Sequence, residues 1–192
     1  MRLGIFGGSF DPPHVGHLLA ATDAYEQLSL DRLVFVPTAT QPLKVGRAAA
    51  SAADRLAMVR LLVGDDPRFE VSAVEVEREG LSYTVDTLEH FASAHPAAEL
   101  VLLAGADVLE TFHQWRNTER VMQLARLAVL ERRGDHAALP KGVKDSSVQR
   151  LQTRRIDVSS TEIRERVRRG QNIRGFVTES VAAHIERSGL YR

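Results

Sequence analysis

Residues 2–8 read Arg-Leu-Gly-Ile-Phe-Gly-Gly, and residues 9–17 continue as Ser-Phe-Asp-Pro-Pro-His-Val-Gly-His. The apolar run over 2–6 predicts a short buried strand, and the apolar positions over 16–28 predict a helix. The two glycines between them allow a ligand to approach the backbone closely. Because the N-terminus of the helix is expected to face the same space, this turn favours binding of an anion.

Strands and helices are expected to alternate along the rest of the chain. The expected strands cover 2–6, 32–36, 69–77, 100–104, 126–131 and 150–156. The expected helices cover 16–28, a segment that starts after Ser51, 84–94, 118–124, 160–169 and 178–187. This alternation predicts an α/β fold, Rossmann-like and doubly wound, with a mainly parallel sheet and helices on both faces. We expect one domain over 1–192, in which 158–192 form a small C-terminal helical extension.

The composition narrows the classes of partner. The chain has 192 residues, of which 25 are Lys or Arg and 25 are Asp or Glu. This balance argues against a large nucleic-acid surface, which needs excess positive charge. Cysteine is absent, which excludes disulfides and thiolate chemistry. No apolar run is long enough to span a bilayer, and the N-terminus lacks a signal-peptide pattern. We expect a soluble cytoplasmic protein that binds neither nucleic acid nor membrane, and the sequence leaves a homo-oligomer open.

Two histidines follow the first strand. His14 and His17 are three residues apart around Gly16, so both rings can reach one phosphate cluster. Imidazole N–H donors suit a phosphate whose negative charge grows during a reaction. The alternative is a structural strand–helix turn with capping histidines. A magnesium site on the two rings is rejected because Mg²⁺ prefers oxygen ligands. Neither the P-loop nor the dinucleotide-binding glycine pattern is present.

A second candidate anion site lies in Ser-Ser-Thr-Glu-Ile-Arg, residues 159–164. Ser159 and Glu162 fit a capping box, although Ser160 or Thr161 would serve equally as the cap. The hydroxyls and the N–H groups at this helix start would bind an anion, and Arg164 adds a guanidinium one turn later. The alternative is an ordinary, well-capped basic helix.

Two further segments carry groups that could contact a ligand. Backbone N–H groups near Tyr83 and Thr84, at an expected helix start, would bind a carboxylate. Gly105 permits close approach at a strand end, and Asp107 can accept hydrogen bonds from ribose hydroxyls. Trp115 offers an indole face that can stack on a positively charged pyridine ring. The alternatives are a capped helix with a packed tyrosine and a lone core tryptophan.

The stretch Gly8-Ser9-Phe10-Asp11-Pro12 with His14-Val15-Gly16-His17, together with 159–164, resembles the H-x-G-H nucleotidyltransferase superfamily. The Ser82-Tyr83-Thr84 and Asp107…Trp115 segments resemble its bacterial nicotinate-nucleotide adenylyltransferases, and the similarity covers essentially the whole chain. The resemblance implies transfer of the adenylyl group of ATP to nicotinate mononucleotide in NAD biosynthesis, with release of pyrophosphate. It also implies Mg²⁺ bound mainly through the ATP phosphates. Other acceptors, nicotinamide mononucleotide or phosphopantetheine, and a non-enzymic nucleotide sensor are the alternatives.

The resemblance also assigns roles to residues. The catalytic set is His14, His17, Lys44 and Arg164. The ATP contacts are Gly8, Ser9, Phe10, His14, Gly16, His17, Gly105, Asp107, Ser159, Ser160, Thr161 and Arg164. The mononucleotide contacts are Gly7, Ser9, Lys44, Ser82, Tyr83, Thr84, Asp107, Trp115 and Arg132. Arg55 is interpreted as structural or as an ion-pair partner. Two departures stand out: Leu43 replaces a frequent histidine, and Glu131-Arg132-Arg133-Gly134 replaces Ala-Arg-Pro-Gly.

Overall fold

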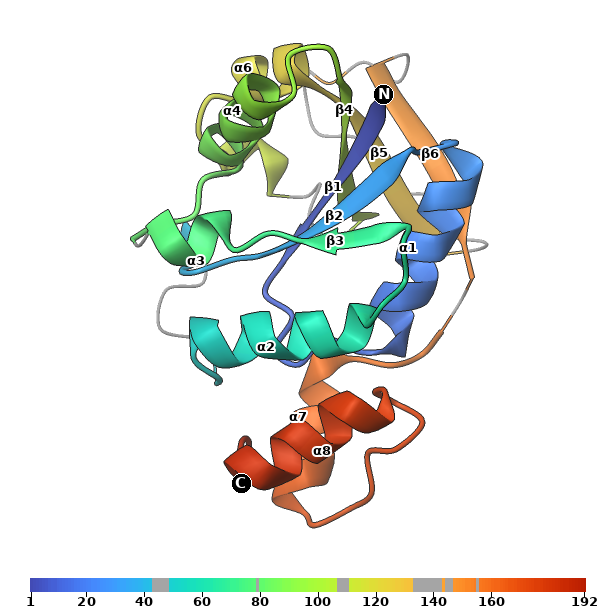
Figure 1. The fold of residues 1–192 in the computed structure, drawn as a ribbon, viewed down its shortest axis with the longest axis vertical. Helices are drawn as coiled ribbons and strands as arrows, with labels where there is room; N and C mark the ends of the chain where they lie inside the picture. The colour runs from blue at the N-terminus through green and yellow to red at the C-terminus, as the bar shows by residue number, and fades with distance from the viewer. Residues whose placement is uncertain (43–48, 79, 107–110, 133–142, 144–146, 155) are drawn as a thin grey trace.

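A six-stranded sheet forms the centre of the computed structural model (Figure 1), which describes residues 1–42, 49–78, 80–106, 111–132, 143, 147–154 and 156–192. Its strands are β1 (Arg2–Gly8), β2 (Arg32–Pro37), β3 (Phe69–Val71), β4 (Glu99–Gly105), β5 (Ala125–Arg132) and β6 (Val148–Thr153). The spatial order is β3-β2-β1-β4-β5-β6, and every pairing is parallel. This order is that of the doubly wound nucleotide-binding fold, so the predicted fold class is confirmed.

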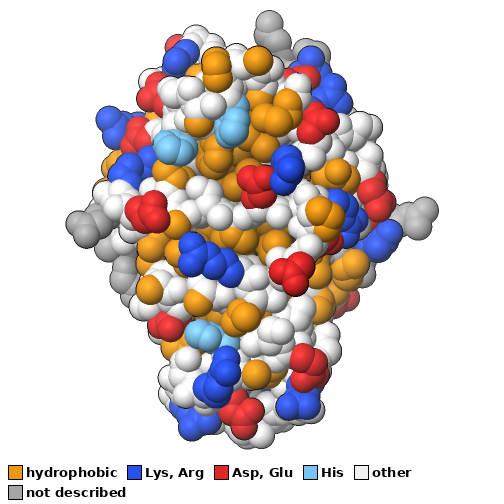
Figure 2. Space-filling view, viewed as in Figure 1, with side chains coloured by type: hydrophobic (Ala, Val, Ile, Leu, Met, Phe, Trp, Pro, Cys, Tyr) orange, Lys and Arg blue, Asp and Glu red, His pale blue; other side chains and the backbone are white. Residues whose placement is uncertain are grey.

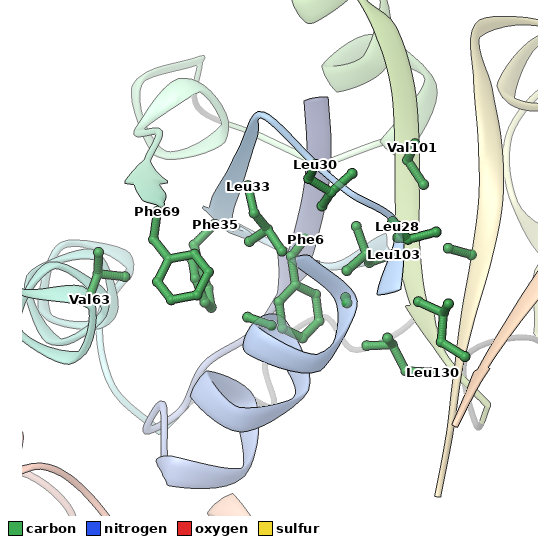
Figure 3. Packing of buried hydrophobic residues seen from close by; sticks show 14 of the residues in the cluster. Phe6, Leu28, Leu30, Leu33, Phe35, Val63, Phe69, Val101, Leu103 and Leu130 are labelled. Carbon is green, nitrogen blue, oxygen red and sulfur yellow. The ribbon is translucent and has the colours of Figure 1, made fainter. Parts of the chain in front are cut away.

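Helices pack on both faces of the sheet. The helices are α1 (Val15–Gln27), α2 (Ala52–Val63), α3 (Val74–Arg78), α4 (Thr84–Ala94), α6 (Thr118–Leu124), α7 (Ser160–Arg168), α8 (Glu179–Ser188) and the 3-10 turn η2 (Phe112–Gln114). Residues of α1 and α2 join one core cluster with the sheet, and residues of α4 and α6 join another. Figure 3 shows the first cluster, where Phe6, Phe35 and Phe69 pack against aliphatic side chains.

The alternation of side chains along each strand explains the two clusters. In β1, Leu3 and Ile5 belong to the cluster of α4 and α6, whereas Phe6 belongs to the cluster of α1 and α2. Successive side chains of a strand point to opposite faces, so a strand between two helical layers must be apolar throughout. This requirement explains the unbroken apolar run of β4, over residues 100–104, and confirms the reading of that run as a strand buried on both faces.

The C-terminal segment packs on α2. Ile163 of α7 and Val181 and Ile185 of α8 share a third core cluster with Met58 and Leu62. In Figure 1 this segment lies beneath α2, at the opposite end of the molecule from α4 and α6. Helix α8 ends at Gly189, whose φ of 63° is in the left-handed region that glycine adopts at low cost, as the sequence predicts.

One expected element is wrong. The segment 69–77 was expected to be a single strand, but the strand stops at Val71 and α3 begins at Val74. The Ser72 N–H donates the last sheet bond to the Phe35 carbonyl, and the Ser72 hydroxyl then accepts the Val74 N–H at 3.3 Å. The alternation of valine with glutamate fits a strand, and in a half-exposed strand Glu75 would face solvent. In the helix, Glu75 is buried.

Charged side chains of both signs are interspersed over the face shown in Figure 2, in agreement with the zero net charge. Met1 and Leu81 are the large hydrophobic residues that are exposed in the described part of the chain. Among the described helices, none has both the length and the apolar character that crossing a membrane requires.

Candidate active site

A cavity of about 890 Å³ opens at the carboxyl ends of the strands. Its wall includes Gly7 and Gly8 of β1, Gly105 of β4, Leu130 of β5 and Thr153 of β6. Helix starts and loops complete it: the turn before α1, the start of α4, the turn around Trp115 and the start of α7. Open α/β sheets bind ligands at this edge, at the point where the strand order reverses, which here lies between β1 and β4.

The segment from Ser9 to His17 joins β1 to α1, includes the first residues of α1 and is called the first turn. Its two histidines lie against each other. Their ring centroids are 3.8 Å apart, and both rings line the cavity. His14 is the N-terminal cap residue of α1, and the Gly16 position brings it close: a Cβ there would lie 2.9 Å from His14 Nδ1. A side chain at position 16 would therefore displace the His14 ring. The predicted pairing of both rings at one site is present.

The hydrogen bonds of His17 define which nitrogen carries the proton. Its Nδ1 accepts the His14 backbone N–H at 3.1 Å, so in the neutral ring the proton lies on Nε2. Burial, with a smaller contribution from His14, lowers the pKa of His17 well below its ordinary value. His17 is therefore neutral near pH 7 and presents Nε2–H as a donor.

The start of α7 contacts the same turn. Ser159 caps α7 by accepting the Glu162 N–H at 3.1 Å, which settles the choice among the three candidate caps. The Ser160 hydroxyl donates to the Pro12 carbonyl at 2.8 Å, and Arg164 Nη1 donates to the Asp11 carbonyl at 2.7 Å. The two candidate phosphate elements, nearly 150 residues apart in sequence, thus lie side by side.

The opposite wall is formed by the start of α4 and the turn around Trp115. Tyr83 occupies the N-cap position of α4 without a capping hydrogen bond from its side chain, and the Arg116 guanidinium lies 4.9 Å from the centre of the Tyr83 ring. Trp115 packs against Phe112, with ring centroids 5.3 Å apart, and is only partly buried because it also lines the cavity. The Asp86 carboxylate lies 3.9 Å from Arg116 and partly balances its charge.

The structure brings most of the predicted site residues to this one cavity. Those that line it are Gly7, Gly8, Ser9, Phe10, His14, Gly16, His17, Ser82, Tyr83, Thr84, Gly105, Trp115, Ser159 and Ser160. Thr161 and Arg164 are not among the described residues that line it, and Arg164 Nη2 donates to the Thr161 hydroxyl at 3.1 Å. Lys44, Asp107 and the departures Leu43 and Arg133 lie outside the described residues, and Arg132 is described only by its backbone in β5.

Arg55 has the structural role that was one of the two interpretations. Its side chain is 1% exposed and donates to the backbone carbonyls of Ser9, Thr38, Ala39 and Ala50 at 2.6–3.3 Å. It therefore fixes the first turn against the segment that follows β2. An arginine in a helix of mixed polarity gives no sequence signal for such a role.

Sequence reasoning missed Glu75, which also lines the cavity. The Thr87 hydroxyl donates to Glu75 Oε1 at 2.7 Å, and burial raises the pKa of this carboxyl.

Glu131, which stands where the family usually has alanine, is buried as well, and its carboxylate binds Arg150 and the Gln152 amide on β6. The acid that replaces alanine is thus paired across the two strands.

Comparison with known proteins agrees with this geometry. A model of the cytidylyltransferase-like family matches residues 5–166. A probable nicotinate-nucleotide adenylyltransferase of Gemmatimonas aurantiaca is 51% identical, over 100% of this chain and 93% of its own length. A protein of the same name from Thermus thermophilus is 45% identical, over 100% of both chains.

Solved structures share the fold. The nicotinic acid mononucleotide adenylyltransferase of Plasmodium falciparum, solved in complex with NaAD, superposes with a TM-score of 0.78 over 99% of this chain and 97% of its own. At 17% identity this likeness concerns the fold alone. The family match over most of the chain and the full-length relatives show that the chain belongs to the cytidylyltransferase-like family and, within it, to the nicotinate-nucleotide adenylyltransferases.

Proposed function

We propose that the cavity holds ATP and nicotinate mononucleotide together for direct in-line displacement at the α-phosphorus of ATP. The chain is a nucleotidyltransferase: it transfers the adenylyl group of ATP to nicotinate mononucleotide and gives nicotinate adenine dinucleotide and pyrophosphate, in NAD biosynthesis. The acceptor phosphate brings the nucleophile and ATP brings the leaving group. Catalysis is then mainly positioning and charge stabilisation.

The paired imidazoles carry this proposal. His17 lines the cavity, and its neutral ring carries the proton on Nε2 because Nδ1 accepts a backbone N–H. Such a donor needs no proton transfer to stabilise the negative charge that develops on the α-phosphate. His14, 3.8 Å away between ring centroids, assists at the same group. The N-termini of α1 and α7 add their backbone N–H groups and positive dipole ends for the β- and γ-phosphates.

Thr161, Arg164 and Lys44 complete the triphosphate site in this proposal. Arg164 is half-buried and donates to the Asp11 carbonyl of the first turn. Its positive charge therefore lies near the α7 end of the site. Lys44 is assigned to the β- and γ-phosphates, as the family resemblance implies.

The acceptor is proposed to bind between α4 and Trp115. The first-turn N–H groups of α4, at Thr84 and Val85, suit the nicotinate carboxylate because they have no intrahelical acceptor. The indole of Trp115 stacks on the pyridine ring, a contact worth about 0.5–2 kcal/mol for a cationic ring. The Arg116 guanidinium adds positive charge at this end. Asp107 is assigned to the ribose hydroxyls, and Arg132 to the mononucleotide.

Magnesium fits this site as a partner of ATP. Glu75 is the carboxylate among the described residues that line the cavity, and it belongs to the acceptor wall, bound to Thr87 of α4. The donors around the first turn are N–H and hydroxyl groups, which suit phosphate oxygens rather than a hard cation. Phosphate oxygens and water would therefore hold Mg²⁺, whose chemistry is to neutralise the charge of the phosphates.

The decisive experiment measures pyrophosphate release with ATP and nicotinate mononucleotide, with the amide analogue in parallel. We expect faster release with the acid. The variant His17→Ala should lose this activity, whereas His90→Ala, an exposed histidine of α4, should retain it. ATP binding without pyrophosphate release from either mononucleotide would refute the proposed reaction and favour a nucleotide sensor.

A further inference from the structure

The carboxylate of Asp11 joins three segments of the chain. It is 6% exposed, and Oδ2 accepts the Ala49 N–H at 2.7 Å. Oδ1 accepts the Ala50 N–H at 3.1 Å and the Tyr191 hydroxyl at 2.7 Å. Asp11 lies in the first turn, and Ala49 and Ala50 lead into α2. Tyr191 is the penultimate residue of the chain.

The C-terminal segment holds the backbone of this turn as well. The Asp11 carbonyl accepts from Arg164, and the Pro12 carbonyl accepts from Ser160. The Val15 N–H, at the start of α1, donates to the Phe176 carbonyl at 3.0 Å. Residues of 160–191 therefore hold the turn that carries both histidines at each of these points, and Tyr191 is the residue of this segment described as binding the Asp11 carboxylate.

Tyr191 is built into the core for this contact. Its side chain is 7% exposed and packs in the third core cluster. Its φ of 66° lies in the left-handed region, which is strained for a residue other than glycine. Burial and the adjacent Asp11 carboxylate raise the pKa of this phenol, so the hydroxyl remains a donor. Simple burial of an aromatic ring requires neither the strained backbone nor the hydroxyl.

We propose that Tyr191 is a positioning residue for the adenylyl transfer, which acts through Asp11 to hold the histidine turn in register with the start of α7. The inference rests on the proposed function, because it assigns Tyr191 to the ATP half of that site. Without the hydroxyl, the Asp11 carboxylate keeps its two backbone donors but loses its own bond to the C-terminal segment, whereas the Asp11 carbonyl still accepts from Arg164. The histidine turn then shifts relative to Ser160 and Arg164, while the acceptor wall at α4 and Trp115 stays in place.

The test compares Tyr191→Phe with Tyr25→Phe. Both variants remove one hydroxyl and keep the ring, and Tyr25 packs against Phe69 and Arg68, on residues that do not line the cavity. Steady-state rates of pyrophosphate release should show the KM for ATP raised about tenfold in Tyr191→Phe, the loss of about 1.4 kcal/mol of binding. The KM for nicotinate mononucleotide should change by less than about twofold, the scale of a surface effect. Tyr25→Phe should leave both constants unchanged.

A double-mutant cycle tests the route through Asp11. In the background of Asp11→Ala, which removes the acceptor of the Tyr191 hydroxyl, Tyr191→Phe should produce no further rise in the KM for ATP, because the two side chains act as one contact. Additive effects would overturn the route. A Tyr191→Phe variant with lower thermal stability but unchanged KM for ATP would overturn the proposal and leave only a structural role. Failure of the wild-type chain to release pyrophosphate would instead refute the proposed function, so the two failures are distinct.

Discussion

Gly7→Ala separates the stability of the fold from its chemistry. Gly7 is the next-to-last residue of β1 and lines the cavity, and a Cβ built there meets no atom within 4 Å. Its φ is outside the left-handed region that only glycine adopts readily. Neither packing nor backbone conformation therefore requires glycine here. We propose that a close approach of the ligand requires it.

The expected effects on stability and activity have opposite signs. Alanine should stabilise the fold by about 0.4–1 kcal/mol, since it restricts the unfolded chain without native strain. The same methyl group should lower kcat/KM by about 10–100-fold, because a misplacement of about 1 Å at the reacting atoms costs on that order. In the alternation of β1, position 7 shares a face with Leu3 and Ile5, which pack with α4. The KM for the mononucleotide should therefore rise more than the KM for ATP.

Urea unfolding and steady-state pyrophosphate release measure the two effects, and Gly4→Ala is the matched control. A Cβ at Gly4 would lie 2.6 Å from Leu30 Cδ1 and 3.2 Å from Leu103 Cδ1, within the core. That variant should lose about 1–3 kcal/mol of stability, but it should keep both KM values wherever it is folded. A Gly7→Ala enzyme with wild-type kinetics would refute the reasoning that ligand approach explains this glycine.

Four other predictions address single groups. His17→Ala should lower kcat by about 10²–10³-fold, the scale for one preorganised donor; unchanged turnover in a folded variant would remove its role. Trp115→Ala should raise the KM for the mononucleotide more than that for ATP, and equal effects in the same assay would exclude stacking. Since burial lowers the pKa of His17, the unfolded chain binds the His17 proton more readily than the folded chain. The stability that neutral His17 contributes should therefore be lost as pH falls below about 6.5. An NMR titration of the His17 ring nitrogens with its midpoint near that pH would contradict this. Burial raises the pKa of Glu75, so the folded chain binds this proton more readily than the unfolded chain and loses stability as pH rises above about 4.3. Glu75→Gln should therefore have a higher thermal stability than the wild type from pH 5 to 7. A lower thermal stability of this variant would count against the account.

The doubly wound fold could be predicted from the sequence because its signals are local. Continuous apolar runs such as 100–104 fit only strands between two helical layers, and Gly189 ends α8 as its position predicts. The segment 69–77 could not be assigned in this way. Its alternating pattern fits a strand, but the polar side chain of Glu75 finds a partner in Thr87, 12 residues further on. Tertiary contacts of this kind are invisible to a local pattern.

Most residues that line the cavity could be anticipated from the sequence, but the contacts that hold them in place could not. His14 and His17 belong to a short motif whose spacing states their chemistry. Asp11, Arg55 and Tyr191 act through backbone carbonyls and through partners up to 180 residues away. The spacing of residues in the sequence does not predict such long-range contacts. The sequence showed a tyrosine near the end of the chain, and only the fold shows that its hydroxyl meets the first turn.

The central claim is that the histidine turn and the start of α7 bind one triphosphate between them. A crystal structure with Mg²⁺ and an ATP analogue whose α,β-bridge is a methylene group tests it directly. We expect the α-phosphate within hydrogen-bond distance of His17 Nε2, and the β- or γ-phosphate at the N–H groups and hydroxyls of Ser159 and Ser160. A triphosphate that touches only one of these two elements would contradict the account.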